Sequence, residues 1–160
     1  MKRRLSVFLV ASLLPFAGCS KQPATPAAGA PIAKHEHHAP HGGTPVVLGD
    51  EVYHLELVRD ADAGKLTAYV LDGEMEEFIR AKAATFEIIA TVGGAKQTLT
   101  FHAVANAATG ETIGNTSQFE ASADWLKTTA TFDGVVTAIE IKGTTFAAVA
   151  FNFPKGNDRD

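Results

Sequence analysis

Cysteine and methionine are scarce in this chain. Cys19 is the single cysteine, so no intramolecular disulfide can form and no second thiol is available for catalysis or metal binding. Of the two methionines, one is the first residue and the other is Met75. A methionine-rich copper(I) site is therefore excluded, and a folded domain must depend on its hydrophobic core for stability.

The chain also lacks an apolar run long enough to span a bilayer as a helix, which takes about 20 residues. Residues 5–16 are apolar, but the run is too short and follows the basic residues Lys-Arg-Arg at 2–4. Residues 17–19 read Ala-Gly-Cys. A basic start, a short apolar stretch and small residues before a cleavage site are typical of a secretory signal. We expect a signal peptide at residues 1–18.

The same segment resembles the lipobox of bacterial lipoproteins, in which the cysteine is lipidated and becomes the mature N-terminus. Phe16 departs from the pattern, which usually has Leu or another aliphatic residue there. The resemblance implies lipidation at Cys19 and attachment to a membrane at the periplasmic face of a cell envelope. Ser20, in place of Asp, favours the outer membrane over the inner one under the sorting pattern of such proteins.

Positive charge becomes scarce once the signal is removed. Loss of the three basic residues at 2–4 leaves 11 of the 14 Lys and Arg residues against 18 Asp and Glu residues. An acidic chain without a basic cluster is a poor candidate for binding nucleic acid or anionic lipid head groups. Membrane attachment is therefore expected through covalent lipid.

Motifs of common enzymes are absent as well. The sequence has no Gly-x-Ser-x-Gly elbow, no His-Glu-x-x-His pair and no glycine-rich phosphate loop. We predict that the protein is not an enzyme.

The composition changes along the chain. Residues 20–34 are rich in Pro, Ala, Thr and Gly and contain almost no large apolar side chain, which is typical of a disordered spacer. We expect the lipidated cysteine and a histidine-rich tether at residues 19–44, one β-domain at residues 45–154 and a flexible tail at residues 155–160.

Beyond residue 45 the sequence alternates with the two-residue period of strands. Strands are expected at residues 51–58, 65–71, 84–92, 96–104, 117–121, 135–142 and 145–153, with a helical turn at 123–128. Phe86, Ile88, Leu99 and Phe101 should point into the core, and the segment 73–83 could be a loop or one or two helical turns. Short strands between frequent turns predict an all-β, antiparallel, immunoglobulin-like sandwich, and a small open barrel fits the same pattern.

Four of the six histidines lie within seven residues: His35, His37, His38 and His41. Neutral imidazole binds copper, zinc and nickel, and short histidine-rich tracts are a metal-binding composition. A flexible tether lets the rings converge on one ion, although the entropy of ordering it limits the affinity. The alternative is a polar linker with incidental histidines.

A second candidate is the pair His54 and Glu56, which strand alternation places on one face. His41 could fold down across Gly42 and Gly43 to share an ion with them. Polar residues on an amphipathic strand also occur without any ligand, and His54 could instead orient the start of the domain by hydrogen bonding.

Residues 35–73 resemble the histidine-rich N-terminal segment of periplasmic adaptor subunits of heavy-metal efflux systems, and small envelope lipoproteins built on it. The resemblance is carried by His41-Gly42-Gly43, Leu48-Gly49-Asp50, Tyr53-His54-Leu55-Glu56-Leu57-Val58, Gly64-Lys65-Leu66 and Tyr69-Val70-Leu71-Asp72-Gly73. It implies a β-domain concerned with transition-metal ions, with His41, His54 and Glu56 as metal-site residues and an envelope or metal-efflux protein as partner. The long hairpin of a true adaptor is absent, so we do not expect an adaptor.

Two functions remain open from the sequence. One is the binding or buffering of transition-metal ions in the periplasm. The other is a non-catalytic envelope lipoprotein that docks onto a protein complex and whose histidine tract is incidental.

Overall fold

The computed structural model describes residues 38–158. The predicted signal, Cys19, His35 and His37 lie outside the described residues. Within residues 38–158 no helix is long and apolar enough to cross a membrane. The elements are β1 (Thr44–Leu48), β2 (Tyr53–Asp60), β3 (Lys65–Asp72), β4 (Thr85–Val92), β5 (Ala95–Ala103), β6 (Gln118–Ser122), the 3-10 helix η1 (Asp124–Lys127), β7 (Phe132–Ile141) and β8 (Thr144–Phe153).

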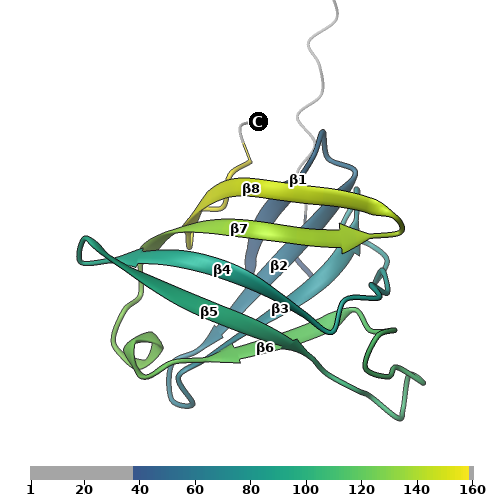
Figure 1. Ribbon diagram of the computed structural model, residues 1–160, viewed down its shortest axis with the longest axis horizontal. Coiled ribbons are helices and arrows are strands. Elements are labelled where there is room, and N and C mark those ends of the chain that lie inside the picture. The colour runs from purple at the N-terminus through teal and green to yellow at the C-terminus, as the bar shows by residue number, and fades with distance from the viewer. Residues whose placement is uncertain (1–37, 159–160) are drawn as a thin grey trace, which may run out of the picture. The chain divides into compact units, whose positions relative to one another are not determined.

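All eight strands belong to one antiparallel sheet with the order β1-β2-β3-β6-β5-β4-β7-β8. The sheet curls until its first and last strands, β1 and β8, come near each other (Figure 1). The predicted all-β, antiparallel class is confirmed. Of the two architectures that fit the sequence pattern, the chain adopts the nearly closed barrel rather than the two-layered sandwich.

The seam between β1 and β8 is bridged by residues that follow β8. The side chain of Asn157 accepts a hydrogen bond from the Val47 backbone N–H at 2.7 Å and donates one to its carbonyl oxygen at 3.2 Å. The Thr44 hydroxyl donates to the Pro154 carbonyl oxygen at 3.2 Å. The ordered barrel therefore extends beyond the predicted boundaries of 45 and 154, because residues on both sides supply these bonds.

The barrel interior is filled by the side chains predicted to point inward. Phe86, Ile88, Leu99 and Phe101 are all buried. The rings of Phe86 and Phe101 stack at 4.7 Å, and Phe119 of β6 meets Phe86 edge-on at 5.3 Å. Burying these apolar side chains is the main stabilising contribution in a domain without disulfides.

The helical turn expected around Trp125 is the 3-10 helix η1, which packs beside β2 and β3. Leu126 is fully buried, and the Trp125 ring meets Phe132 at 5.3 Å. The Arg59 guanidinium donates hydrogen bonds to the carbonyl oxygens of Leu126 and Lys127 at 2.6 and 3.1 Å. These bonds satisfy carbonyl groups that a short helix leaves without internal partners.

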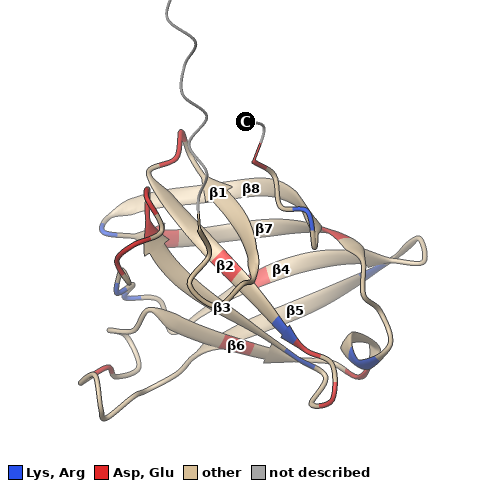
Figure 2. Ribbon diagram, turned by 180° about the vertical axis from the view of Figure 1, so that it is seen from behind, with Lys and Arg blue, Asp and Glu red and all other residues tan. Residues whose placement is uncertain are grey.

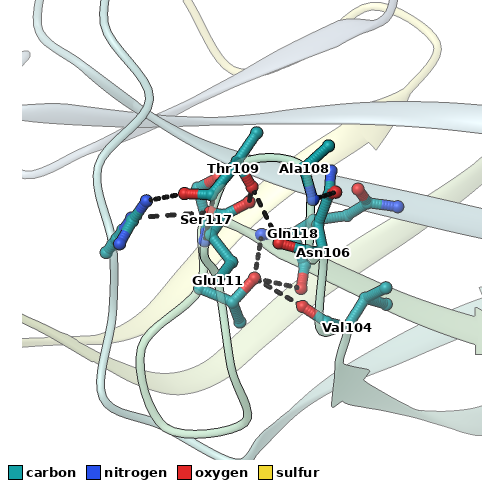
Figure 3. A network of polar contacts seen from close by, with 9 residues as sticks. Val104, Asn106, Ala108, Thr109, Glu111, Ser117 and Gln118 are labelled. Atoms are coloured by element: carbon teal, nitrogen blue, oxygen red, sulfur yellow. Dashed lines mark hydrogen bonds and ion pairs between the residues drawn. The ribbon is translucent and has the colours of Figure 1, made fainter.

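The loop between β5 and β6 is organised around a buried carboxylate, Glu111 (Figure 3). Glu111 accepts hydrogen bonds from the backbone N–H and the hydroxyl of Ser117 at 2.8 and 2.7 Å, and from the Thr109 hydroxyl at 2.7 Å. Burial raises the pKa of this carboxyl, but the bonds from Ser117 and Thr109, together with the nearby Arg80, outweigh it and hold the pKa below its ordinary value. The loop is thus held by an ionised group.

Candidate functional site

The outer face of β2 carries the two polar residues predicted for a site, His54 and Glu56. Alternation along the strand puts Leu55 and Leu57 into the barrel and these two side chains on the opposite face. Both are nevertheless fully buried, with no exposed surface. The face is not a solvated strand surface, because residues 41–43 bind Glu56 and the end of β3 contacts His54 through the Asp72 carbonyl oxygen.

Glu56 holds the end of the histidine-rich segment. Its Oε1 accepts hydrogen bonds from the backbone N–H groups of His41 at 2.7 Å and Gly43 at 2.9 Å. Its Oε2 lies 2.8 Å from Nδ1 of the His41 ring. A buried carboxylate is costly unless it is paired and hydrogen-bonded. Here three donors from residues 41–43 offset that cost.

The His41 ring is held between aromatic neighbours. It stacks on Tyr69 of β3 with 3.9 Å between ring centroids and 13° between the planes. Phe78, in the segment after β3, lies 5.8 Å from the same ring. The His41 side chain is still 38% exposed. One edge of the ring therefore faces Glu56, while the side chain as a whole remains accessible to solvent.

The two glycines after His41 have separate roles. Gly42 has a φ of +66°, in the left-handed region that favours glycine, and its N–H donates to the Ala39 carbonyl oxygen at 3.0 Å to close a turn. A Cβ on Gly43 would lie 2.7 Å from the Leu57 carbonyl oxygen and 2.8 Å from Cγ of Glu56. The His-Gly-Gly sequence is thus suited to a tight turn followed by close contact with β2.

The structure places His54 in different surroundings from His41. Its Nδ1 lies 3.2 Å from the Asp72 carbonyl oxygen, at the end of β3. His38 is exposed, just before the turn. The structure thus joins His41 to Glu56, and it brings together no group of three or more His, Cys, Asp or Glu side chains suited to a metal ion within residues 38–158.

Acidic residues line two turns at one end of the β2–β3 pair (Figure 2). Asp50 and Glu51 lie between β1 and β2, and Glu74, Glu76 and Glu77 follow β3. All five are exposed. Their negative charge favours the approach of cations to this part of the barrel, subject to screening by salt.

Sequence reasoning did not identify Tyr69 or Phe78 as part of this site. Burial raises the Tyr69 pKa, and the charges of Glu56 and Glu120 raise it further, against an opposing effect of Lys65. Tyr69 therefore remains a neutral phenol beside His41. Its place opposite Glu56 in the β2–β3 register is the signal that could have identified it, had the pairing been known.

No protein-family model, curated protein or solved structure matches this chain. The resemblance over residues 35–73 thus remains a prediction.

Proposed function

We propose that this chain is a lipid-anchored protein of the periplasmic face of the envelope that binds transition-metal ions, namely copper(II), nickel or zinc, through its histidine-rich segment. The observation that carries the proposal is the bond between Nδ1 of His41 and the buried carboxylate of Glu56. Histidines that bind metal through one ring nitrogen typically donate the other N–H to a carboxylate or carbonyl group. His35, His37 and His38 would supply further imidazoles.

The arrangement also supports the proposal energetically. A tether that must be ordered around an ion loses conformational entropy, which lowers the affinity. Three hydrogen bonds to Glu56 already fix residues 41–43, so part of that ordering precedes metal binding. Alternatively, the contacts between residues 41–43 and Glu56 serve only to cover the surface of the barrel. This alternative predicts no affinity for metal.

Calorimetric titration tests the metal site. The chain with Cys19→Ser, purified without lipid, should bind copper(II), nickel or zinc at neutral pH with a dissociation constant of about 1 μM, or about −8 kcal/mol. Replacing His35, His37, His38 and His41 together by Asn should abolish binding. His102→Asn is the matched control, because His102 is exposed on β5 and should leave the affinity unchanged. Absence of binding by the intact histidine segment would refute the metal function.

The anchor is tested separately in cells. Cys19→Ser removes the single cysteine, so the variant should appear in the soluble periplasmic fraction or as an unprocessed precursor. The unsubstituted chain should fractionate with membranes and incorporate labelled fatty acid. Membrane retention and normal processing of the variant would contradict the lipid anchor without affecting the metal proposal.

A further inference from the structure

Both oxygens of Glu56 are already engaged by residues 41–43. Oε1 accepts hydrogen bonds from two backbone N–H groups, and Oε2 lies 2.8 Å from Nδ1 of His41. Glu56 is fully buried below them. Direct binding of a metal ion to this carboxylate would require the ion to enter a closed space and break the bonds that fasten the segment. Glu56 is therefore poorly placed as a ligand.

The same contacts determine which ring nitrogen of His41 has a lone pair available to bind a metal ion. An ionised carboxylate only accepts hydrogen bonds, so Nδ1 must carry the proton that is shared with Oε2. In the neutral ring the lone pair is then on Nε2, across the ring from Glu56. The stacking contact with Tyr69 at 3.9 Å fixes the plane of the ring. Nε2 thus has a defined protonation state and a defined direction.

His54 is oriented toward a different part of the barrel. It lies two residues before Glu56 on the same face of β2, but its ring is fully buried and its Nδ1 faces the Asp72 carbonyl oxygen at 3.2 Å. This contact ties His54 to the end of β3. Its position accounts for a structural role in holding that end of the strand.

We infer that His41 binds a divalent transition-metal ion through Nε2, and that Glu56 is an outer-sphere positioning residue that fixes the tautomer and direction of the His41 ring. Neither Glu56 nor His54 contacts the ion. This inference rests on the proposed metal function and assigns the roles of the residues within it. Changes in the carboxylate partners of metal-binding histidines typically lower metal affinity by about 10- to 100-fold.

The first experiment needs no metal. The tautomer of His41 is read from nitrogen-15 NMR of the histidine rings in the chain with Cys19→Ser. The neutral ring should carry its proton on Nδ1, and Glu56→Gln should weaken that preference. His102 serves as an internal reference, since its side chain is exposed. A proton on Nε2 of His41 in the unsubstituted chain would overturn the inference.

The second experiment measures metal binding in matched variants. Glu56→Gln should weaken copper(II) or zinc binding about 10- to 100-fold, and His41→Asn should weaken it at least as much. Circular dichroism verifies that each variant stays folded. In the copper(II) complex, pulsed electron paramagnetic resonance with selectively nitrogen-15-labelled His41 should show Nε2 bound and Nδ1 remote.

The outcomes separate this inference from the proposed function. Binding that is unchanged in folded Glu56→Gln and His41→Asn variants would overturn the inference while leaving a metal-binding histidine segment. Coordination of copper through Nδ1 would overturn it as well. If a folded His54→Asn variant loses as much metal affinity as His41→Asn, then His54 is a metal ligand. That result would contradict the inference that His54 does not contact the ion. Failure of the unsubstituted chain to bind any of the three metals would refute both proposals.

Discussion

At the residue scale, the two buried carboxylates of the barrel are used in the same way. Glu56 and Glu111 each accept at least one backbone N–H group and contact one or more side-chain donors from a segment that has no regular secondary structure. The sequence singled out Glu56 because of its neighbours His54 and His41. It gave no reason to single out Glu111, whose donor Ser117 comes within hydrogen-bonding distance only when the loop folds back on itself.

Glu111 makes the stability of the barrel dependent on acid. Its folded-state pKa lies below the ordinary value of 4.5, so its contribution is present above that value and is lost as the pH falls through the folded-state pKa. Glu111→Gln should lower the free energy of unfolding by about 1–3 kcal/mol at neutral pH. The difference from the unsubstituted chain should shrink in acid, as measured by urea denaturation at several pH values.

Glu87→Gln is the matched control for that measurement. Glu87 is exposed on β4 and its contact with the Thr100 hydroxyl is long, at 3.5 Å. Its replacement should change the stability little at any pH. A pH-independent loss of stability in Glu111→Gln would show that the ionised state of Glu111 is not what holds the loop.

At the element scale, the strands that alternate clearly were predicted to within a few residues, because burial of one face imposes the two-residue period. β1 was not identified as a strand. It has five residues, includes Pro45 and is defined by pairing with β2. The segment after β3 could not be assigned either. It forms two isolated bridges, Leu71 with Phe78 and Ala81 with Thr116. The second bridge depends on a partner distant in sequence.

The segment at residues 39–43 gives an element-scale prediction. Gly43→Ala would place a Cβ against the Leu57 carbonyl oxygen, so the segment should lift from β2 and the His41–Glu56 bond should break. We expect a loss of about 1–3 kcal/mol in unfolding free energy and faster hydrogen exchange of the His41 and Gly43 amides.

Gly42→Asn is the matched substitution. A Cβ at Gly42 would meet nothing within 4 Å, and Asn tolerates a positive φ better than most residues. The variant should retain the slow exchange of both amides. Equal exchange rates in the two variants would contradict the assignment of the close contact to Gly43.

At the scale of the whole molecule, the pattern of strands could not decide between a sandwich and a barrel. Both architectures bury alternate residues of short antiparallel strands. The difference lies in which strands become neighbours: β3 pairs with β6, and β4 pairs with both β5 and β7. The β3–β6 and β4–β7 pairings join residues far apart in the chain. The contacts of Asn157 with β1 could not be predicted either. They also join residues far apart in the chain, and polar residues near a chain end usually indicate a tail.

Asn157→Ala should weaken the closure of the barrel. The substitution removes hydrogen bonds to both the N–H and the carbonyl group of Val47, and we expect a loss of about 1–3 kcal/mol with faster exchange of the Val47 amide. Asn152→Ala is the control, because that side chain bonds Asp133 in an exposed pair. The free energy of unfolding of both variants is measured by urea denaturation. Comparable losses would show that the contacts of Asn157 stabilise the barrel no more than an exposed hydrogen bond does.

The contact between Thr44 and Pro154 brings the two ends of the barrel's chain close together, so the strands could be connected in another order along the chain. Because these residues lie on either side of the seam, with 3.2 Å between the Thr44 hydroxyl and the Pro154 carbonyl oxygen, a short peptide could join residue 158 to the start of β1. The exposed turn at Gly93 and Gly94, where a Cβ would meet nothing within 4 Å, offers a place for new ends. The barrel should therefore tolerate circular permutation, with β5 as its first strand and β4 as its last.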